Sequence, residues 1–297
     1  MDEVDVSIIY VNWNCSGEML KSIASVRRLA TGCTREIIVV DNLSPEDISG
    51  LEQPDIHLIR NPVNGGFGSG CNVGAKAAKG KYLLFLNPDT LLLNDVPGIL
   101  FGFLEKHPDA GACGAMLRDS DGAINYNGGR RRLGLVNEIL EHSSLCFKYP
   151  RVPFIGRPYY GNWDHRSTRQ VQCLCGACMM FRREVFFAEG GFDERFFMYC
   201  EEMDLCRRTL LAGRKIFYVH SAELMHENRK STMQYYGTFH RFVMQYLDST
   251  RIHFLKHYGR VYTRVWRWCI GGIYFLKYVR HRRKEDLEKA RWGMSFV

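Results

Sequence analysis

The fold of this chain is decided by the stretch Tyr82-Leu83-Leu84-Phe85-Leu86-Asn87-Pro88-Asp89, in which an apolar run leads directly into a polar turn. Such continuous apolarity is typical of a central strand covered on both faces. Similar β-branched runs occur upstream, at residues 6–11, 36–40 and 56–60, and helical patterns lie between them at residues 16–29 and 70–79. This alternation predicts an α/β fold with a mostly parallel central sheet flanked by helices.

Further along the chain the pattern weakens and then returns. Ser44-Pro45-Glu46-Asp47 has the cap, first-turn proline and early acids of a short helix. We also expect strands at residues 110–117 and 215–219 and a helix at residues 201–212. Residues 119–170 have little periodicity, which leaves open a functional loop or a poorly ordered one.

Charge and cysteine content restrict the class of protein. The formal net charge is +8, yet residues 251–284 contain ten Lys or Arg and no Asp or Glu, so the rest is close to neutral. We therefore expect a catalytic domain over residues 1–230 and a basic, aromatic-rich helical extension over residues 231–297. The eleven cysteines lack the paired spacing of a zinc site, and the acidic start does not resemble a signal peptide. These features predict a cytoplasmic protein.

Polar residues follow each of the four predicted strands, at the edge where open parallel sheets bind ligands. They are Asn12 and Asn14, Asp41-Asn42, the loop 61–70, and Asn87-Pro88-Asp89. Turn or cap roles would explain any one of them alone. The glycine-rich loop 64–70 follows the third strand and lacks the G-x-G-x-x-G pattern, which argues against a nicotinamide-dependent enzyme.

Several motifs, taken in order, resemble the family 2 glycosyltransferases of the GT-A fold, and among them the rhamnosyltransferase-type enzymes of cell-surface polysaccharide synthesis. The resemblance covers roughly residues 4–230, and it rests on Val11-Asn12-Trp13-Asn14, Val39-Val40-Asp41-Asn42, Asn61-Pro62-Val63-Asn64-Gly65-Gly66-Phe67-Gly68, Leu86-Asn87-Pro88-Asp89, Gly190-Gly191-Phe192-Asp193-Glu194 and Phe197-Met198-Tyr199-Cys200-Glu201-Glu202. The family's Asp-x-Asp motif stands here as Asn87-Pro88-Asp89, and its Glu-Asp pair stands as Glu201-Glu202.

The resemblance implies a metal-dependent, inverting transfer by single displacement. It assigns Asp89, with His226, to Mg²⁺ or Mn²⁺, and it makes Glu202 the general base, with Glu201 as the second candidate. Simpler roles remain open, because Asp89 could cap a following helix and acids in a first helical turn complement the helix dipole. Asp204 and Arg208, four residues apart, are expected to form an ion pair.

The resemblance also implies a nucleotide-sugar donor, either dTDP-rhamnose or a UDP-sugar. Asn12 and Asp41 are assigned to the base and ribose, and Asn87 to the ribose or sugar. The nucleotide wall is expected to include Asn64, Gly66 and Asn72. The implied acceptor is a hydroxyl of a glycan or polyprenyl-linked oligosaccharide.

Two other functions remain as alternatives. A sugar nucleotidyltransferase would normally have a glycine-rich loop with Arg and Lys after the first strand, which residues 12–18 lack. A catalytically degenerate, membrane-associated glycan-binding or scaffold protein would bind neither metal nor donor.

The basic C-terminal segment has apolar residues at helical spacing, namely Leu255, Tyr258, Tyr262, Trp266, Cys269 and Ile273. The uncharged run at residues 268–276 is too short to cross a bilayer. The segment could be an anchor on the cytoplasmic membrane surface or a helix packed against protein. No recognised module accompanies the basic patch, so nucleic-acid binding is not expected. Whether the protein is an oligomer stays open.

Overall fold

The computed structural model describes residues 4–226 and 237–295. The chain divides into two compact units, one formed by Met1–Arg130 with His165–Tyr235 and the other by Arg131–Asp164 with Tyr236–Val297. The second unit therefore includes residues 131–164, which had little periodicity in the sequence, together with the C-terminal helices.

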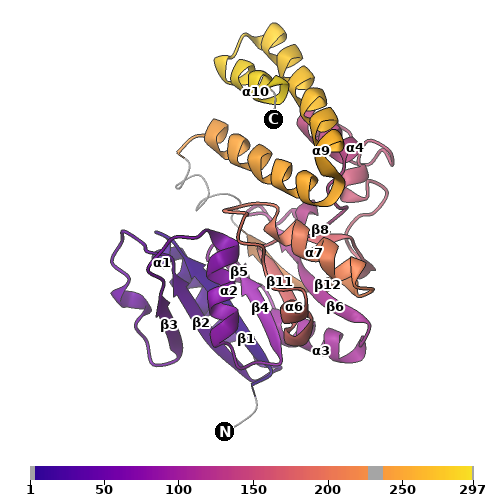
Figure 1. Ribbon diagram of the computed structural model, residues 1–297. Coiled ribbons are helices and arrows are strands. Elements are labelled where there is room, and N and C mark those ends of the chain that lie inside the picture. The colour runs from indigo at the N-terminus through magenta and orange to yellow at the C-terminus, as the bar shows by residue number, and fades with distance from the viewer. Residues whose placement is uncertain (1–3, 227–236, 296–297) are drawn as a thin grey trace. The chain divides into compact units, whose positions relative to one another are not determined.

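The first unit is built on a mixed sheet with the strand order β3-β2-β1-β4-β11-β6-β12-β5, which can be followed in Figure 1. The four neighbouring strands β3, β2, β1 and β4 run parallel to one another. Strand β11 is antiparallel to its neighbours β4 and β6. Strand β12 is parallel to β6 and antiparallel to β5. Their bounds are β1 Val6–Asn12, β2 Arg35–Asp41, β3 Ile56–Arg60, β4 Tyr82–Leu86, β5 Thr90–Leu92, β6 Ala110–Arg118, β11 Cys178–Arg182 and β12 Lys215–His226.

Helices cover both faces of this sheet because its buried strands are apolar on both sides. One face, including Ile8 and Leu84, packs in a single core with α1 (Ser16–Leu29) and α3 (Val96–Lys106). On the other face the Phe85 ring lies 5.0 Å from Phe186 of α6 (Arg183–Ala188). The same unit contains α2 (Phe67–Ala77) and α7 (Glu201–Leu211).

Small residues let α2 lie close to the sheet, as its composition predicted. A Cβ atom on Gly74 would lie 2.5 Å from Cγ2 of Ile9, and one on Gly70 would lie 2.8 Å from Cγ1 of Val11. The close approach holds the start of α2 beside the carboxyl ends of β1 and β2.

The predicted helix at residues 44–47 is wrong, since the structure has only a short 3₁₀ turn nearby, at Ser49–Leu51. The side chains that would cap or open such a helix have other partners. Oγ of Ser44 accepts hydrogen bonds from the Asn12 amide and from Asn14 N, and the Glu46 carboxylate accepts from Ser16 N. The predicted final strand is longer than expected and continues as β12 to His226, with a register shift after Val219.

The weakly periodic region contains short elements and no long ordered helix. They are β7 Ile124–Asn125, η2 Tyr126–Gly128, β8 Gly129–Arg130, α4 Leu135–His142, α5 Leu145–Lys148 and η3 Arg157–Tyr159, followed by β9 Arg169–Gln170 and β10 Cys173–Leu174. Strand β8 pairs with β10, which brings Arg130 opposite Cys173.

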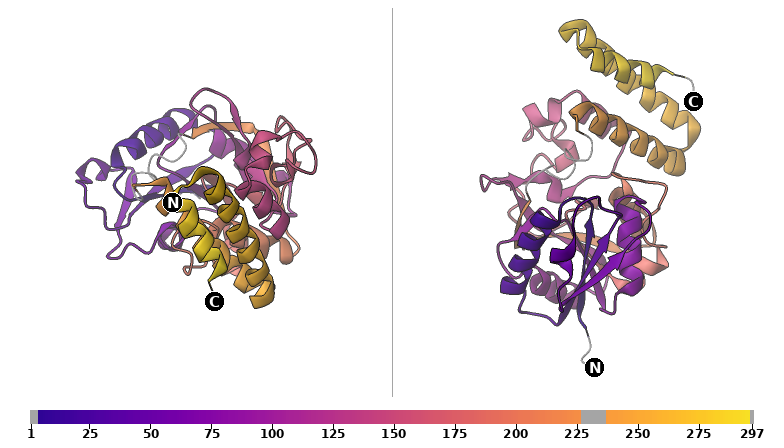
Figure 2. Two further views of the ribbon diagram at one scale, coloured as in Figure 1. Left: turned by 90° about the horizontal axis from the view of Figure 1, so that it is seen from above. Right: turned by 90° about the vertical axis from the view of Figure 1, so that its left-hand side faces the viewer.

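The second unit is dominated by α9 (Phe239–His281) and α10 (Lys284–Met294), which lie side by side in both views of Figure 2. The apolar residues at helical spacing, from Leu255 to Ile273, lie in α9 on both sides of a bend. Gly259 has φ of 82° and ψ of 179°, so α9 consists of two helices that meet at this residue. Beyond the bend, Gly271 and Gly293 allow α9 and α10 to approach closely.

A buried polar cluster connects α4 to α9 within this unit. The Glu138 carboxylate is fully buried, accepts a hydrogen bond from the Tyr246 hydroxyl and lies 3.5 Å from Nε2 of His142. Nδ1 of His142 in turn lies 3.0 Å from the Tyr274 hydroxyl, and Lys277 donates to the His142 carbonyl. The hydroxyls of Tyr246 and Tyr274 and the ammonium of Lys277 supply the hydrogen bonds of this cluster, whereas Oε2 of Glu138 and Nε2 of His142, among the described residues, make only the 3.5 Å contact with each other.

Candidate functional site

The carboxyl ends of β1 and β2 meet in a hydrogen-bond network around Asn12. Its side-chain amide donates to Oδ1 of Asp41 at 2.8 Å, to Oγ of Ser44 at 3.0 Å and to Oε1 of Glu46 at 3.2 Å. Asn12 and Asp41 are buried. The two residues assigned to the nucleotide base and ribose are therefore in direct contact. Ser44 and Glu46, which sequence reasoning placed in a helix, belong to the same network.

The loop after β3 is held by side-chain amides. Asn42 donates to the Gly66 carbonyl at 2.9 Å and accepts from Asn61, while Oδ1 of Asn64 accepts from Gly66 N at 3.0 Å. Gly66 has φ of 86°, and a Cβ atom there would lie 1.8 Å from the carbonyl oxygen of Phe197. This loop and the segment before α7 are thus in backbone contact, which only glycine permits.

Asn72 has a different environment from the other predicted nucleotide contacts. Its amide donates to the Phe192 carbonyl at 2.8 Å and to Oε1 of Glu194 at 3.0 Å, and it accepts from Phe192 N at 2.9 Å. The hydrogen-bonding groups of Asn72 are used to hold the turn at residues 191–194. Within this structure Asn72 acts as a connection between α2 and that turn.

Asp89 and His226 are brought together by strand pairing. Thr90 of β5 pairs with His226 of β12, so Asp89, one residue earlier, lies beside the end of β12. Nε2 of His226 lies 3.3 Å from Oδ1 of Asp89, and both side chains are buried. A strand follows Asp89, so its alternative role as a helix cap is wrong.

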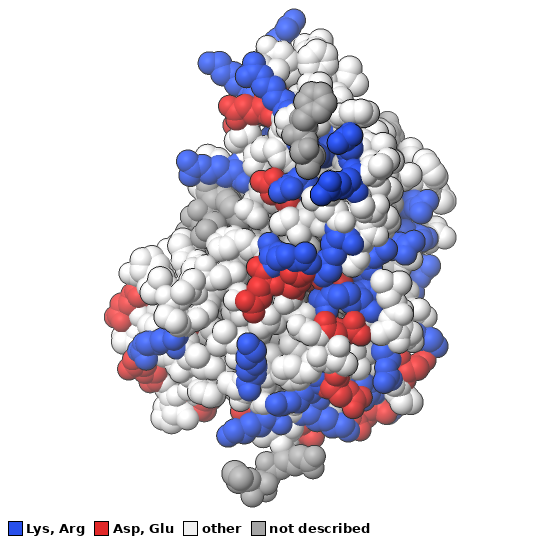
Figure 3. Space-filling model, in the orientation of Figure 1, with Lys and Arg blue, Asp and Glu red and all other residues white. Residues whose placement is uncertain are grey.

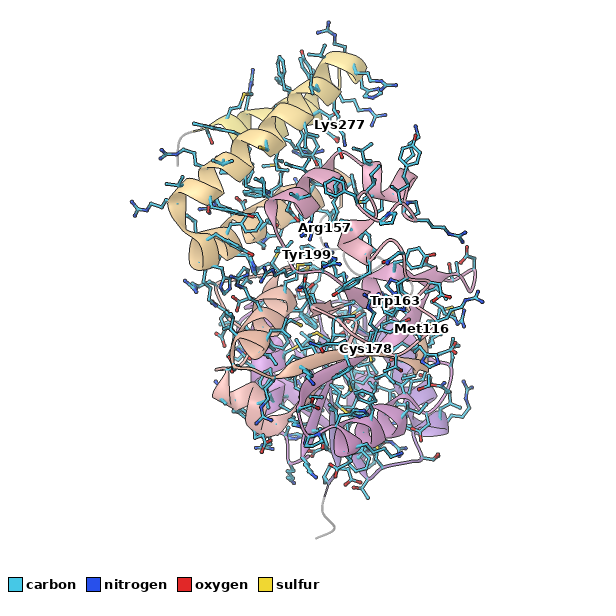
Figure 4. The ribbon with its side chains drawn as sticks, turned by 90° about the vertical axis from the view of Figure 1, so that its right-hand side faces the viewer. Met116, Arg157, Trp163, Cys178, Tyr199 and Lys277 are labelled. Carbon is cyan, nitrogen blue, oxygen red and sulfur yellow. The ribbon has the colours of Figure 1, made fainter. Side chains whose placement is uncertain are left out.

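The backbone of Asn87 is hydrogen-bonded to the residue before β11 and to the first residue of β5. Its backbone N donates to the Ala177 carbonyl at 3.0 Å, and its carbonyl accepts from Oγ1 of Thr90 at 2.7 Å. These contacts hold the Asn87-Pro88-Asp89 turn at the ends of β4 and β11. Cys178, which starts β11, is labelled in Figure 4.

The Asp89 carboxylate and the His226 imidazole form a donor set that suits a divalent cation. Mg²⁺ and Mn²⁺ prefer carboxylate oxygens, accept few protein ligands and take the remainder from phosphates and water. On Nδ1 of His226 no hydrogen-bond partner exists among the described residues. The residues present therefore fit a cation shared with a diphosphate.

The two glutamates open α7 after a strained backbone. Tyr199, labelled in Figure 4, has φ of 70°, and Cys200 has φ of 69°, so two non-glycine residues in succession are left-handed. Such strain costs about 1–3 kcal/mol for each residue and is concentrated at functional sites. It fixes the direction in which Glu201 and Glu202 leave the backbone. The predicted helix at residues 201–212 is confirmed.

The environments of the two carboxyl groups differ. Burial, and then the charge of Glu202, raise the pKa of Glu201 well above its ordinary value. Burial also raises the pKa of Glu202, but backbone N–H groups and the Arg130 guanidinium oppose that rise. The Cβ atom of Glu201 lies 3.5 Å from the Cβ position of Gly68, at the first turn of α2. Of the two glutamates, Glu202 is the one for which a cation among the described residues, Arg130, favours the ionised form.

Arg130 is a site residue that sequence reasoning missed. It is buried on β8, where it faces Cys173 of β10, and its charge acts on Glu202, Cys173 and Cys175. The available signal was the run Arg130-Arg131-Arg132 inside a region without periodicity. Nothing in that run distinguishes the first arginine from the next two.

Two cysteines each lie within electrostatic range of more than one carboxylate of the site. Burial raises the pKa of Cys175 to about 12, and the charges of Glu202 and Asp89 both contribute to that rise. Burial likewise raises the pKa of Cys15 to about 12, with contributions from Glu46 and Asp89. The charge of Asp89 therefore acts on Cys175 together with that of Glu202, and on Cys15 together with that of Glu46.

The predicted ion pair within α7 is present. Nε of Arg208 lies 2.8 Å from Oδ2 of Asp204, and Arg208 also donates to the Glu189 and Gly191 carbonyls. This pair anchors the helix to the turn before it. None of the eleven cysteines, all of which lie in the described residues, forms a disulfide. Burial raises the pKa values of Cys175 and Cys178, and a hydrogen bond with Cys206, followed by burial, raises the pKa of Cys173, which agrees with a packing role.

Comparison with known proteins places this site in a family context. The model of the family described as Glycosyl transferase family 2 matches residues 7–187. The chain is 30% identical over 242 residues to the N-acetylglucosaminyl-diphospho-decaprenol L-rhamnosyltransferase of Mycobacterium tuberculosis, covering 76% of each chain. It is 26% identical over 207 residues to Rhamnosyltransferase WbbL of Escherichia coli K12, covering 66% of this chain and 75% of that protein.

Solved structures share the fold. The mannosyltransferase PcManGT of Pyrobaculum calidifontis, in complex with GDP-Man and Mn²⁺, matches with a TM-score of 0.60 and 14% identity, covering 99% of this chain and 74% of that one. GalNAc-T7 with UDP, GalNAc and Mn²⁺ matches with a TM-score of 0.55 and 16% identity, covering 75% of this chain and 43% of that one. These likenesses confirm the predicted GT-A fold.

Proposed function

The chain belongs to glycosyl transferase family 2 and is a glycosyltransferase of polysaccharide synthesis, and we propose that it transfers rhamnose from dTDP-rhamnose to a hydroxyl group of a polyprenyl-linked oligosaccharide or other glycan. The names of the mycobacterial and enterobacterial relatives support the sugar, and the first of them supports the lipid-linked acceptor. The observation that carries the proposal is the Asp89–His226 pair, in which Oδ1 and Nε2 lie 3.3 Å apart where β5 pairs with the end of β12.

At the nucleotide end, Asp41 and Asn12 would receive the base and ribose. The Asp41 carboxylate can accept the imide N–H of thymine or uracil, and Asn12 holds that carboxylate in place. Asn64 and Gly66 shape the neighbouring loop, and Asn87 faces the ribose or sugar in this proposal. Asn72 contributes by holding the turn at residues 191–194.

At the reaction centre, Glu202 removes the proton of the acceptor hydroxyl as its oxygen attacks the anomeric carbon. The bond from that carbon to the β-phosphate oxygen breaks on the opposite side, and its electron pair leaves with the nucleotide diphosphate, so the configuration inverts. Asp89 and His226 would hold a divalent cation, which would supply positive charge to stabilise the departing diphosphate. Glu201, whose protonated form is favoured, is the second candidate for the base.

A thermal-shift titration tests this function. We expect dTDP with Mn²⁺ to raise the melting temperature, and dTDP alone to raise it much less. At a hundredfold excess over Kd, binding stabilises the protein by about 2.7 kcal/mol. Asp89→Asn should remove the metal-dependent part, whereas Asp121→Asn, at an exposed turn, should retain it.

The outcome also separates the possible donors. A larger metal-dependent shift with UDP than with dTDP would replace the rhamnose donor by a UDP-sugar and leave the transfer reaction in place. No metal-dependent shift with dTDP, UDP or GDP would contradict the proposed donor and metal site together.

A further inference from the structure

The C-terminal half of α9 has two apolar faces, and only one of them is buried. The inner face contains Trp266, Ile270 and Tyr274, which are buried, and Gly271, which lies against Gly293 of α10. Arg267 on the same face donates to Oγ of Ser295. Packing within the second unit therefore accounts for this face, which holds part of the apolar pattern recognised in the sequence.

The other face is an apolar stripe exposed to solvent. We define the stripe by its exposed residues, which are Val261, Val265, Trp268, Phe275, Leu276 and Val279. At 100° per residue these six positions fall within a sector of about 100°. Val261 is 79% exposed, Trp268 54% and Leu276 69%, so large apolar side chains face water along about 27 Å of helix.

Cationic residues border the stripe. Arg260, Arg264 and Arg280 are exposed on its flanks, and residues 251–284 contain no Asp or Glu. Figure 3 shows Lys and Arg side chains gathered over the helical unit. A protein partner or a second copy of the same stripe would bring these cations into an apolar interface without counter-charges. An anionic lipid surface supplies both the apolar interior and the opposite charge.

We propose that the stripe Val261–Val265–Trp268–Phe275–Leu276–Val279 inserts into the interfacial layer of an anionic membrane, with α9 lying parallel to the surface. None of the helices in the described part of the chain combines the length and apolarity that a bilayer crossing requires. The helix therefore lies in the interface, with the arginines at the headgroups and Trp268 at the acyl boundary. The inference does not rest on the proposed donor or reaction.

Vesicle co-sedimentation of the full chain tests the proposal. We expect binding to phosphatidylglycerol/phosphatidylcholine vesicles that weakens with salt, and at least tenfold weaker binding to pure phosphatidylcholine. Leu276→Glu should lower the affinity at least tenfold. Leu211→Glu is a matched control, because Leu211 is 70% exposed on a helix of the other unit and should leave binding unchanged.

Spectroscopy gives a readout that general misfolding would not reproduce. The emission of Trp268 should shift to the blue on vesicle addition, and Trp268→Phe should remove that shift while the protein still binds. Arg264→Gln should weaken binding about fivefold, the effect expected for one interfacial charge.

Two results would overturn the inference. One is equal vesicle binding by the parent protein and the Leu276→Glu variant. The other is a concentration-dependent dimer that Leu276→Glu dissociates, without vesicle binding by the parent protein, which would assign the stripe to a second copy of the chain. Because these assays contain no nucleotide, they can fail or succeed independently of the thermal-shift experiment.

Discussion

The carbonyl oxygen of Phe197 lies 1.8 Å from the position that a Cβ atom on Gly66 would occupy. The same carbonyl accepts a hydrogen bond from Phe67 N at 3.1 Å. The loop assigned to the nucleotide is thus fixed to the segment that leads into Glu201 and Glu202. A change at one end of the site is expected to displace the other.

Gly66→Ala should therefore impair both stability and turnover. The new methyl group would meet backbone atoms, and φ of 86° adds the cost of a left-handed alanine. We expect a loss of more than about 2 kcal/mol in the free energy of unfolding. Gly122→Ala is the matched control, since Gly122 has φ of 83° with nothing within 4 Å of its Cβ position. Equal losses in urea unfolding would contradict the close-contact explanation.

The identity of the base is tested by amide substitutions in α7. Glu202→Gln should lower kcat about 10²- to 10⁴-fold, the usual contribution of a general base, with little change in donor affinity. Glu201→Gln should have a smaller effect on kcat. Steady-state kinetics with isothermal donor titration would check this, and the reverse order of the two effects would make Glu201 the base.

Glu201 should also make stability depend on pH. Its pKa is raised by burial and by Glu202, so the native state holds this proton more tightly than the unfolded state does. The stability that this tightly held proton contributes to the native state is complete below the ordinary carboxyl pKa. It is lost as the pH rises through the raised pKa of Glu201. Glu201→Gln should therefore increase the melting temperature at pH 8 and have less effect at pH 4. A variant less stable than the parent at pH 8 would contradict this assignment.

Arg130 is expected to act as a positioning residue through Glu202. The arginine opposes the rise in the pKa of Glu202, so this pKa should be higher in the Arg130→Met variant. In a plot of kcat/KM against pH, the acidic limb should therefore move to higher pH. Arg130→Lys retains the charge and should keep the limb near its original position. If both variants lose activity equally at every pH, the role of Arg130 is structural.

The Asp204–Arg208 pair should contribute far more to stability than a surface pair. Asp204 is fully buried, and Arg208→Met would leave its carboxylate without this cation, at a cost of about 3 kcal/mol or more. Arg27 forms a comparable 2.6 Å pair with Asp55, but both side chains are largely exposed. Arg27→Met should cost less than about 1 kcal/mol. Denaturant unfolding of both variants provides the comparison.

Local pattern was sufficient for the elements of the sheet and for the polar ends of its strands. Continuous apolar runs identified β1, β2, β4 and β6, because burial on two faces is visible in composition. Helical periodicity identified α2 and α7. The predicted helix at residues 44–47 failed. The Ser44 hydroxyl and the Glu46 carboxylate instead have partners on β1 and α1, since Ser44 accepts from Asn12, 32 residues away, and Glu46 accepts from Ser16, 30 residues away.

What only the tertiary structure decided is which of these residues meet. The pairing of Thr90 with His226 places the Asp89 carboxylate beside the His226 imidazole, although the two residues are more than a hundred positions apart in the sequence. Arg130 and the stripe on α9 were equally hidden, because their meaning depends on what packs against them. A sequence records local periodicity, whereas contact between distant segments and the exposure of one face of a helix arise only when the chain has folded.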